Sequence, residues 1–472
     1  MKKRRLTALG LAAVMACSMT ACGSGANSGD AVDAKNPGAG TEGGGADTNG
    51  DDTKDGGKDT GTDGDKVISF WNIGTEDPDA SIMKYAVDAY NAKEGAQSGY
   101  TVEMTAIQND KYKEKLVIAM SSGECPDMYT SWSGGPLNEY INSGFAQPVT
   151  KLYEEAGLKD VYMEAATSQV TINGEIYGVP VLNVSISGVF YNKEIFDRLN
   201  LKEPQTISEL EAVCDTLVEN KITPFALGNS TKWQGSMYYQ GLATRYAGLD
   251  DFRAAYDGSG SFEADCFVYA GNKILDWAKK GYFQEGCNGV STDDGQDRQA
   301  IYQETAAMMY SGSWFTGTFS ADSEEFYAKM GWFPFPQCDE VDNGADFANI
   351  CNGTVGDQFV SFNCEGEKLD AAFQCASYYS SDEAVSLMVE KGKIPPINNI
   401  KEKLTDPLAI EICEFVENAS DVQLWYDQYL PTAVANAHLD NSQLLFSQET
   451  TAQEVAKATQ DAMAAYLEEQ KK

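Results

Sequence analysis

The residues best suited to chemistry in this chain are tryptophans and a few scattered polar side chains. Seven tryptophans are present, and several stand at the starts of loops rather than inside apolar periodic runs. Planar aromatic rings pack against the weakly apolar C–H faces of sugars, while Asp, Glu and Asn side chains hydrogen-bond sugar hydroxyls. The polar candidates are Glu76, Asn183 and Asp427. Trp71 and Trp332 fall inside strand-like runs, so we expect these two in the core.

The sequence gives little support for a metal-binding site or for a catalytic site with a nucleophile. Eleven cysteines occur without a Cys-x-x-Cys pair, and His438 is the single histidine, so zinc-site spacing is missing. A Ser-His-Asp or Cys-His apparatus would have to use His438, which has no nucleophile motif beside it and is interpreted as an ordinary surface or helix histidine. A glycoside hydrolase needs two carboxylates flanking a sugar, and 71 acidic residues leave that alternative open. We predict no catalytic residue, no metal and no cofactor.

Length and charge bound the class of protein. At 472 residues the chain suits two lobes with additional segments rather than one ordinary domain. Its net charge of −36 argues against nucleic acid as a partner and against electrostatic docking on anionic lipid. We interpret the acidic residues as a solubilising surface and expect a monomer.

Residues 1–22 are typical of a secretion signal. Lys2–Arg5 are basic, and Leu6–Ala16 form an apolar run too short to span a bilayer. The small residues before Cys22 resemble a bacterial lipobox, which implies that Cys22 is lipidated and becomes the new N-terminus; Val14–Cys17 is a second match. This implies a lipid-anchored chain on the outer face of the cytoplasmic membrane, in a Gram-positive-type cell envelope, that meets the membrane only through its lipid.

Residues 23–65 are rich in Gly, Asp, Thr and Asn and nearly lack aliphatic side chains. Such a segment cannot bury enough apolar area to offset its ordering entropy, so we predict a disordered tether through a cell wall. Its Asp/Gly repeats loosely resemble calcium loops but lack the spacing and final Glu of an EF-hand.

Nine cysteines remain after Cys17 and Cys22 are set aside, and an odd number in an exported chain leaves at least one free thiol. Either disulfides or buried, reduced cysteines fit the sequence, and we favour mostly reduced thiols. The cysteines close enough in sequence for a disulfide are Cys338, Cys351, Cys364 and Cys375.

The folded body is predicted to begin at Lys66 with alternating strands and helices. Strands are expected at residues 67–71, 101–107 and 127–131, with helices at 79–92 and 111–122. This alternation predicts a parallel sheet with right-handed crossovers, on which ligands bind beyond the carboxyl ends of the strands. Those ends are Gly74–Glu76, Gln108–Asp110 and Trp132–Gly135.

The stretch Asn173–Phe196, NGEIYGVPVLNVSISGVFYNKEIF, combines a turn, a break and a buried strand. Asn173-Gly174 tolerates positive φ at both central turn positions, which predicts a β-hairpin. Pro180 cannot donate to a strand ladder. Val184–Tyr191 is β-branched and aromatic enough for a buried strand, and a helix is expected from Asn192.

This order resembles the family 1 extracellular solute-binding proteins of sugar ABC transporters, the maltose-binding-protein-like group. There the pattern NGK-Y-G-P followed by YNK--F occurs where the chain first crosses between lobes. Further similarities are KYKEKLVIAMSSGECPDMYTSW at residues 111–132 and AAMMYSGSW at residues 306–314. The resemblance covers roughly residues 66–470, and it is carried by the order and spacing of these motifs together.

The resemblance implies an α/β fold of the two-lobe periplasmic-binding-protein type (type II), with a multi-crossing hinge and a cleft between the lobes. It implies a first crossing near Val181–Val184, a second at Gly331–Pro336, and a return through Phe347–Phe362 to a third near Asp370–Ser380. We therefore predict one lobe from residues 66–182 and 332–378, and the other from residues 183–331 and 379–472.

The resemblance also implies a site and a function. It places Trp132, Trp233, Trp314 and Trp425 on the cleft walls, and Asn183 where the family often has an acidic hinge residue. The implied function is to bind an oligosaccharide between the lobes and deliver it to ABC transporter permease subunits. A secreted glycoside hydrolase and a sugar-sensing or adhesion receptor on the same fold are the alternatives.

Overall fold

The computed structural model describes residues 66–341 and 346–471. The predicted signal sequence, the lipidated Cys22 and the tether of residues 23–65 lie outside these ranges. The chain from Lys66 onwards is one compact unit. Within the described ranges, no helix combines the length and the apolar character needed to cross a bilayer.

The first sheet has the strand order β2-β1-β3-β12-β6. Its strands are β1 (Val67–Asn72), β2 (Thr101–Ala106), β3 (Met128–Ser131), β6 (Val179–Val181) and β12 (Gln358–Phe362). β1 pairs in parallel with both β2 and β3, which confirms the predicted parallel arrangement. β12 runs antiparallel between β3 and β6, so a late segment of the chain completes this sheet.

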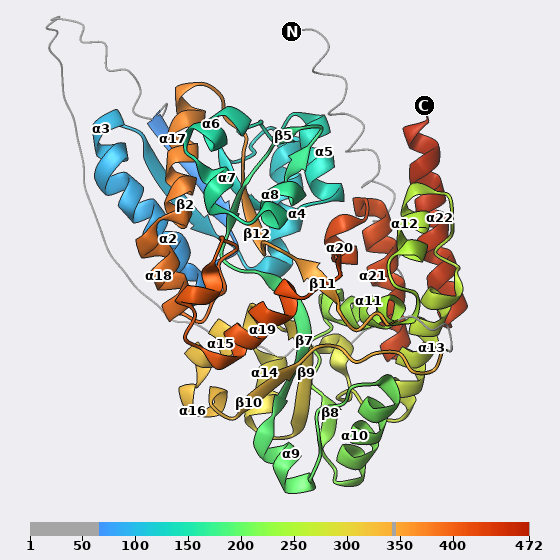
Figure 1. Ribbon diagram of the computed structural model, residues 1–472. Coiled ribbons are helices and arrows are strands. Elements are labelled where there is room, and N and C mark those ends of the chain that lie inside the picture. The colour runs from blue at the N-terminus through green and yellow to red at the C-terminus, as the bar shows by residue number, and fades with distance from the viewer. Residues whose placement is uncertain (1–65, 342–345, 472) are drawn as a thin grey trace, which may run out of the picture. The chain divides into compact units, whose positions relative to one another are not determined.

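Helices from distant parts of the chain cover the first sheet. α2 (Asp79–Tyr90) buries Ile82, Met83, Ala86, Val87 and Tyr90, the spacing of one helical face. α17 (Glu367–Ser377) and α18 (Asp382–Glu390) contact α2, and Figure 1 shows these two orange helices beside the blue one. The other helices before β6 are α3 (Ala96–Ser98), α4 (Asn109–Ser122), α5 (Gly135–Ser143), α6 (Thr150–Glu155), α7 (Leu158–Val161) and α8 (Glu164–Gln169).

The second sheet has the order β13-β11-β7-β9-β8, and β10 also pairs with β7. Its strands are β7 (Ser185–Asn192), β8 (Thr223–Phe225), β9 (Ala306–Gly312), β10 (Met330–Phe333), β11 (Ile350–Thr354) and β13 (Asp421–Gln423). All eight residues of β7 are buried, as expected for a strand with neighbours on both sides. β7 is antiparallel to β9, β10 and β11, so it organises this sheet.

The second sheet is surrounded by the remaining helices. The longer ones are α10 (Ile207–Glu219), α11 (Trp233–Ala247), α13 (Asp265–Lys279), α19 (Pro407–Glu417), α21 (Thr432–Phe446) and α22 (Ala452–Gln470). The shorter ones are α9 (Lys193–Leu199), α12 (Asp250–Asp257), α14 (Gln296–Tyr302), α15 (Phe315–Asp322), α16 (Glu324–Tyr327) and α20 (Tyr426–Tyr429). α11, α13, α21 and α22 pack on one another, and Figure 1 shows the red C-terminal helices beside the green and yellow ones.

The predicted Asn-Gly hairpin is present. Asn173 has φ 53° and Gly174 has φ 85°, the positive values that a tight hairpin turn requires. The turn joins β4 (Thr171–Ile172) to β5 (Glu175–Ile176), which pair antiparallel. Further along, the Asn192 side chain accepts hydrogen bonds from the first turn of α9 and caps the predicted helix.

Three chain segments run between the two sheets. The first is Leu182–Val184, between β6 and β7, at the hinge position that the sequence predicts. The second is Val355–Asp357, between β11 and β12. The third follows α18: Ile394 lies against the first crossing, where Val184 N donates to Ile394 O at 2.7 Å.

Two of the predicted crossings are wrong. Gly331–Pro336 begins in β10, which pairs with β7 inside the second sheet, and Asp370–Ser380 begins in α17, which packs on α2 and β12 of the first. Two further segments lie in a different lobe from the one predicted. β11 was predicted in the first lobe, but it pairs with β7 and β13 of the second sheet. α18 was predicted in the second lobe, but it packs on α2 of the first. Both differences arise from long-range pairing and packing, which the local sequence pattern does not encode.

The nine cysteines of the described ranges are all free, and eight of them are buried. Burial raises the pKa of Cys125, Cys351 and Cys364 to about 12. Their thiols are therefore protonated at neutral pH.

Candidate ligand-binding cleft

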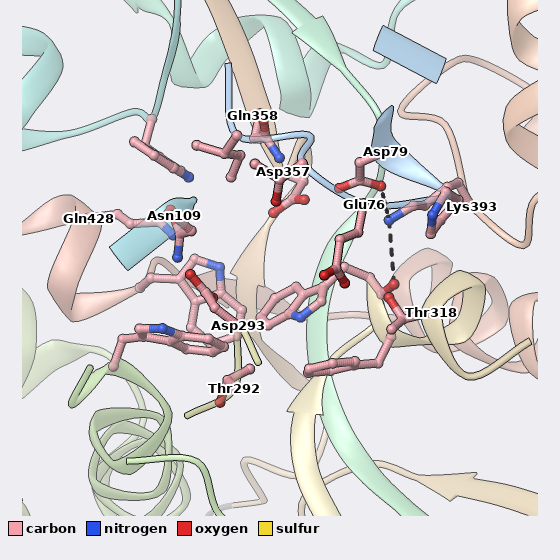
Figure 2. Close-up of a pocket in the computed structure, with 18 of the residues that line it drawn as sticks. Glu76, Asp79, Asn109, Thr292, Asp293, Thr318, Asp357, Gln358, Lys393 and Gln428 are labelled. Atoms are coloured by element: carbon pink, nitrogen blue, oxygen red, sulfur yellow. Dashed lines mark hydrogen bonds and ion pairs between the residues drawn. The ribbon is translucent and has the colours of Figure 1, made fainter. Parts of the chain in front are cut away.

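A cleft opens between the two sheets and encloses about 1100 Å³, open solvent at its mouth included. From the first lobe it is lined by the residues that follow β1, by the first turns of α4 and by Trp132 after β3. These are the carboxyl ends of the parallel strands, as the sequence analysis expected. Asp357, Gln358 and Lys393, from two of the crossing segments, also reach the cleft (Figure 2).

The second lobe contributes a wall of three indoles. Trp233 begins α11, Trp314 follows β9, and Trp425 lies between β13 and α20. The ring centroids of Trp233 and Trp314 are 5.7 Å apart, and those of Trp314 and Trp425 are 6.0 Å apart, both in edge-to-face geometry. The three rings thus touch in series and form one continuous aromatic surface.

Trp132 faces this wall from the first lobe. Its ring contacts Tyr112 edge-to-face at 5.9 Å, and the Lys113 ammonium lies 4.7 Å from its centroid. A cation at this distance from an indole is attracted to the ring quadrupole. Lys113 also pairs with Asp427 of the second lobe, with Nζ and Oδ2 3.3 Å apart, so the pair bridges the cleft.

Several residues that line the cleft carry a covered polar atom with no hydrogen-bond partner among the described residues. They are Trp233 Nε1, Trp425 Nε1, Gln358 Oε1 and Gln428 Oε1. Buried donors and acceptors in folded proteins are nearly always paired, because an unpaired one retains its full desolvation penalty. Two donors and two acceptors therefore lie unpaired beside the cleft, within the described residues.

Asp357 is a half-buried carboxyl at the crossing between β11 and β12, and it lines the cleft. Burial raises its pKa from 3.8 to about 6, although the nearby Lys393 ammonium acts in the opposite direction. Lys393 itself pairs with Asp79, with Nζ and Oδ1 2.6 Å apart. Figure 2 shows Asp357 and Gln358 together, with Lys393 and Asp79 joined beside them.

Six of the seven candidate residues line this cleft. They are Glu76, Trp132, Trp233, Trp314, Trp425 and Asp427. Asn183 is absent from the lining: it is completely buried, its Nδ2 donates to Val184 O and Ser313 Oγ, and its Oδ1 accepts from Ile394 N. Its side chain joins the first and third crossings.

The residues expected outside the site lie outside it. Trp332 is buried in a core cluster, and Trp71 packs partly buried against the same cluster. His438 lies on α21, buried, with Nε2 2.9 Å from Ser236 Oγ, and burial lowers its pKa to about 4.

The charged and amide residues at the floor and rim of the cleft were not predicted from the sequence. Those named here are Lys113, Arg298, Asp357, Gln358, Lys393 and Gln428. Lys113 lies within the motif at residues 111–132 and one turn beyond a predicted strand end, so it could have been predicted as a cleft residue from the sequence. Asp357 and Lys393 reach the cleft only because separate crossings converge, and no local pattern marks them.

The sequence profile described as "Bacterial extracellular solute-binding protein" matches residues 73–386. An uncharacterised ABC transporter extracellular-binding protein of Pyrococcus horikoshii is 26% identical over 352 residues, 73% of this chain and 75% of that protein. The multiple sugar-binding protein of Streptococcus mutans is 25% identical over 297 residues, which are 61% of this chain and 66% of that protein.

Solved structures agree with this match. A structure from work on xylan utilization by Caldanaerobius polysaccharolyticus is 28% identical and superposes with a TM-score of 0.76, over 84% of this chain and 99% of that one. A chitin oligosaccharide binding protein has the same TM-score at 20% identity, over 84% of this chain and 98% of that one, and supports the fold. The chain therefore belongs to the bacterial extracellular solute-binding protein family.

Proposed function

We propose that this chain is the substrate-binding component of a carbohydrate ABC importer, which holds an oligosaccharide in the cleft and delivers it unchanged to the permease. The observation that carries the proposal is the indole wall of Trp233, Trp314 and Trp425 with two unpaired indole N–H groups. Rings stack on sugar C–H faces, and the N–H groups donate to hydroxyls. The relative from Streptococcus mutans is named as a sugar-binding protein, which supports the same ligand class.

The ligand residues that we propose are Glu76, Trp132, Trp233, Trp314, Trp425 and Asp427. They come from both lobes, so a bound oligosaccharide contacts the two walls together only when the cleft is closed. A ligand with more contacts in the closed state shifts the population toward that state. A wall of three rings in series suits several sugar units better than one.

Binding without catalysis is also part of the proposal. A hydrolase would use two carboxyl groups on either side of a glycosidic bond, one of them protonated as an acid. Asp357 has a pKa raised by desolvation and lies near the Lys393 ammonium, and its role in this proposal is to hydrogen-bond the ligand rather than to act as an acid.

Isothermal titration calorimetry with the chain from Lys66 onwards tests the proposal, since both sheets and their cores lie within that unit. Xylo-, cello-, malto- and chito-oligosaccharides of increasing length are the probes. We expect at least one series to bind with a dissociation constant in the millimolar range or tighter, to shift tryptophan fluorescence, and to be recovered intact after prolonged incubation. Failure of every series to bind would contradict the proposed ligand class, and new reducing ends would identify a hydrolase.

We also propose that Cys22 carries the lipid anchor. Labelling cells with a radioactive fatty acid should mark the wild-type chain, and the Cys22→Ser variant should lose the label and appear in the medium. Equal membrane retention of both chains would contradict the anchor.

A further inference from the structure

The cleft contains three cationic side chains, and each is already engaged by the protein. Lys113 pairs with Asp427 at 3.3 Å. Lys393 pairs with Asp79 at 2.6 Å and is only 1% exposed. The Arg298 Nε donates to Asp322 Oδ2 at 3.0 Å, and Nη1 donates to Thr292 O at 3.1 Å. Each of the three cations that line this cleft, within the described residues, thus has an acidic partner in the protein, although the Lys113 side chain is still 46% exposed.

Carboxylates outnumber these cations in the lining. Six acidic residues line the cleft: Glu76, Asp77, Asp79, Asp293, Asp357 and Asp427. Asp77 pairs with Lys391 at 3.2 Å, so one further charge is compensated from just outside the cleft. The cleft remains negative, and a second anion brought into it would be repelled at short range and low effective dielectric.

Recognition of a ligand carboxylate or sulfate normally uses a free arginine fork or lysine ammonium. Neutral hydroxyls instead accept from indole N–H groups and donate to carboxylates and amide oxygens, all of which this cleft presents. We infer that the cleft selects neutral oligosaccharides and rejects those that carry uronic acid or sulfate groups. The Lys113–Asp427 and Lys393–Asp79 pairs determine this specificity, because they occupy the cations an acidic sugar would need.

This inference rests on the proposed function and adds that the cleft selects its oligosaccharide by charge. The experiment compares neutral and acidic probes of the same backbone and length: xylotetraose with its glucuronic acid-substituted form, and cellotetraose and maltotetraose with forms oxidised to one C6 carboxylate. Calorimetry at neutral pH and low salt is the measurement. We expect the acidic member of the binding pair to bind about tenfold more weakly, or worse, than the neutral one.

A charge variant makes the test specific to the named pairs. Asp427→Asn removes the partner of Lys113 while retaining a polar side chain of similar size, and should improve the affinity for the acidic probe about fivefold or more relative to the neutral probe. Asp79→Asn, which frees Lys393, is the second variant. The matched control is Asp88→Asn, which breaks the exposed Lys84–Asp88 pair on α2 and should leave the ratio unchanged.

The outcomes separate the inference from the function. Equal or tighter binding of the acidic probe would overturn selection by charge and leave carbohydrate binding in place. An unchanged affinity ratio in both folded cleft variants would show that the pairs do not set it, which also overturns the assignment. If no probe of either charge binds, the proposed ligand class itself fails.

Discussion

The first crossing and the indole wall both contain buried polar atoms, but only those at the crossing have hydrogen-bond partners within the described residues. At the crossing, the amide of Asn183 has every group used within the protein. Along the wall, Trp233 Nε1 and Trp425 Nε1 are buried and find no partner in the part of the chain that the structure describes. A satisfied buried polar group stabilises a fold, whereas an unsatisfied one beside a cavity is available to a ligand. Changes at the crossing should therefore lower stability, and changes on the wall should lower affinity.

Asn183→Ala should have the largest effect. It removes three hydrogen bonds in a fully buried site and leaves Ile394 N and Val184 O with fewer partners. We expect the free energy of unfolding to fall by about 4 kcal/mol, because several buried groups lose their partners together. Denaturant unfolding monitored by circular dichroism is the measurement. A loss of unfolding free energy below about 1 kcal/mol would contradict the claim that the Asn183 hydrogen bonds stabilise the fold.

Asp357→Asn tests a residue that connects the two regions, because its backbone N–H donates to Asn183 O of the first crossing and its side chain lines the cleft. Its folded pKa of about 6 exceeds the ordinary 3.8, so the folded chain holds a proton that the unfolded chain releases between these values. Its contribution to stability is therefore present below pH 3.8 and lost as the pH rises toward 6. At pH 7 the variant should be more stable by about 2–3 kcal/mol, since one pKa unit corresponds to about 1.4 kcal/mol.

The pH series supplies the control for this variant. Wild type and Asp357→Asn should have similar unfolding free energies near pH 3.5 and diverge above pH 4, because every other titrating group is common to both. Parallel curves across this range would mean that Asp357 does not titrate abnormally. A simultaneous loss of oligosaccharide affinity would identify Asp357 as a ligand contact whose burial lowers stability.

Trp314→Ala tests the middle of the indole wall. The ring contacts both Trp233 and Trp425, so its removal takes away stacking area and the continuity of the surface. We expect oligosaccharide affinity to fall by about 1–3 kcal/mol. Calorimetry gives the affinity, and the unfolding transition measured on the same sample shows whether the variant is folded. Trp332→Phe, a core change away from the cleft, is the matched control and should leave the affinity unchanged.

Trp233→Phe should have the smallest effect and is the sharpest test of the unpaired indole groups. It keeps an aromatic face and removes only the larger ring system and the buried N–H. Loss of one hydrogen bond to a hydroxyl should weaken binding by about 1 kcal/mol. Stability should stay the same or rise slightly, because a buried donor without a partner is gone. A lower stability at unchanged affinity would contradict the assignment of this group to the ligand.

Much of the fold was predictable because its signals are local. The alternation around β1, β2 and β3, the Asn-Gly turn and the apolar run of β7 each occupy one short stretch. The cleft tryptophans were predicted mainly from the resemblance to the solute-binding family, and only Trp132 also follows a strand of the predicted parallel sheet. Strand ends on such sheets converge on one edge, so position along the chain predicts position in space.

The remaining features depend on contacts between distant segments. The type of residue at Asn183 suits a ligand site, and only the meeting of two crossings shows that its hydrogen bonds are used internally. Asp357 and Lys393 enter the cleft for the same reason. The lobe that α18 joins is decided by its packing on α2, which no property of α18 alone reveals.

The buried thiols of the described ranges have a practical consequence for measuring closure of the cleft. Reaction with maleimides needs an accessible thiolate, and eight of these nine cysteines are buried. Cys125, the partly exposed one, has a pKa raised to about 12. A maleimide fluorophore will therefore react selectively with a cysteine engineered at an exposed position, such as Ser386 on α18. With a second label of this kind on the other lobe, distance changes between the lobes become measurable without replacing any of these native thiols.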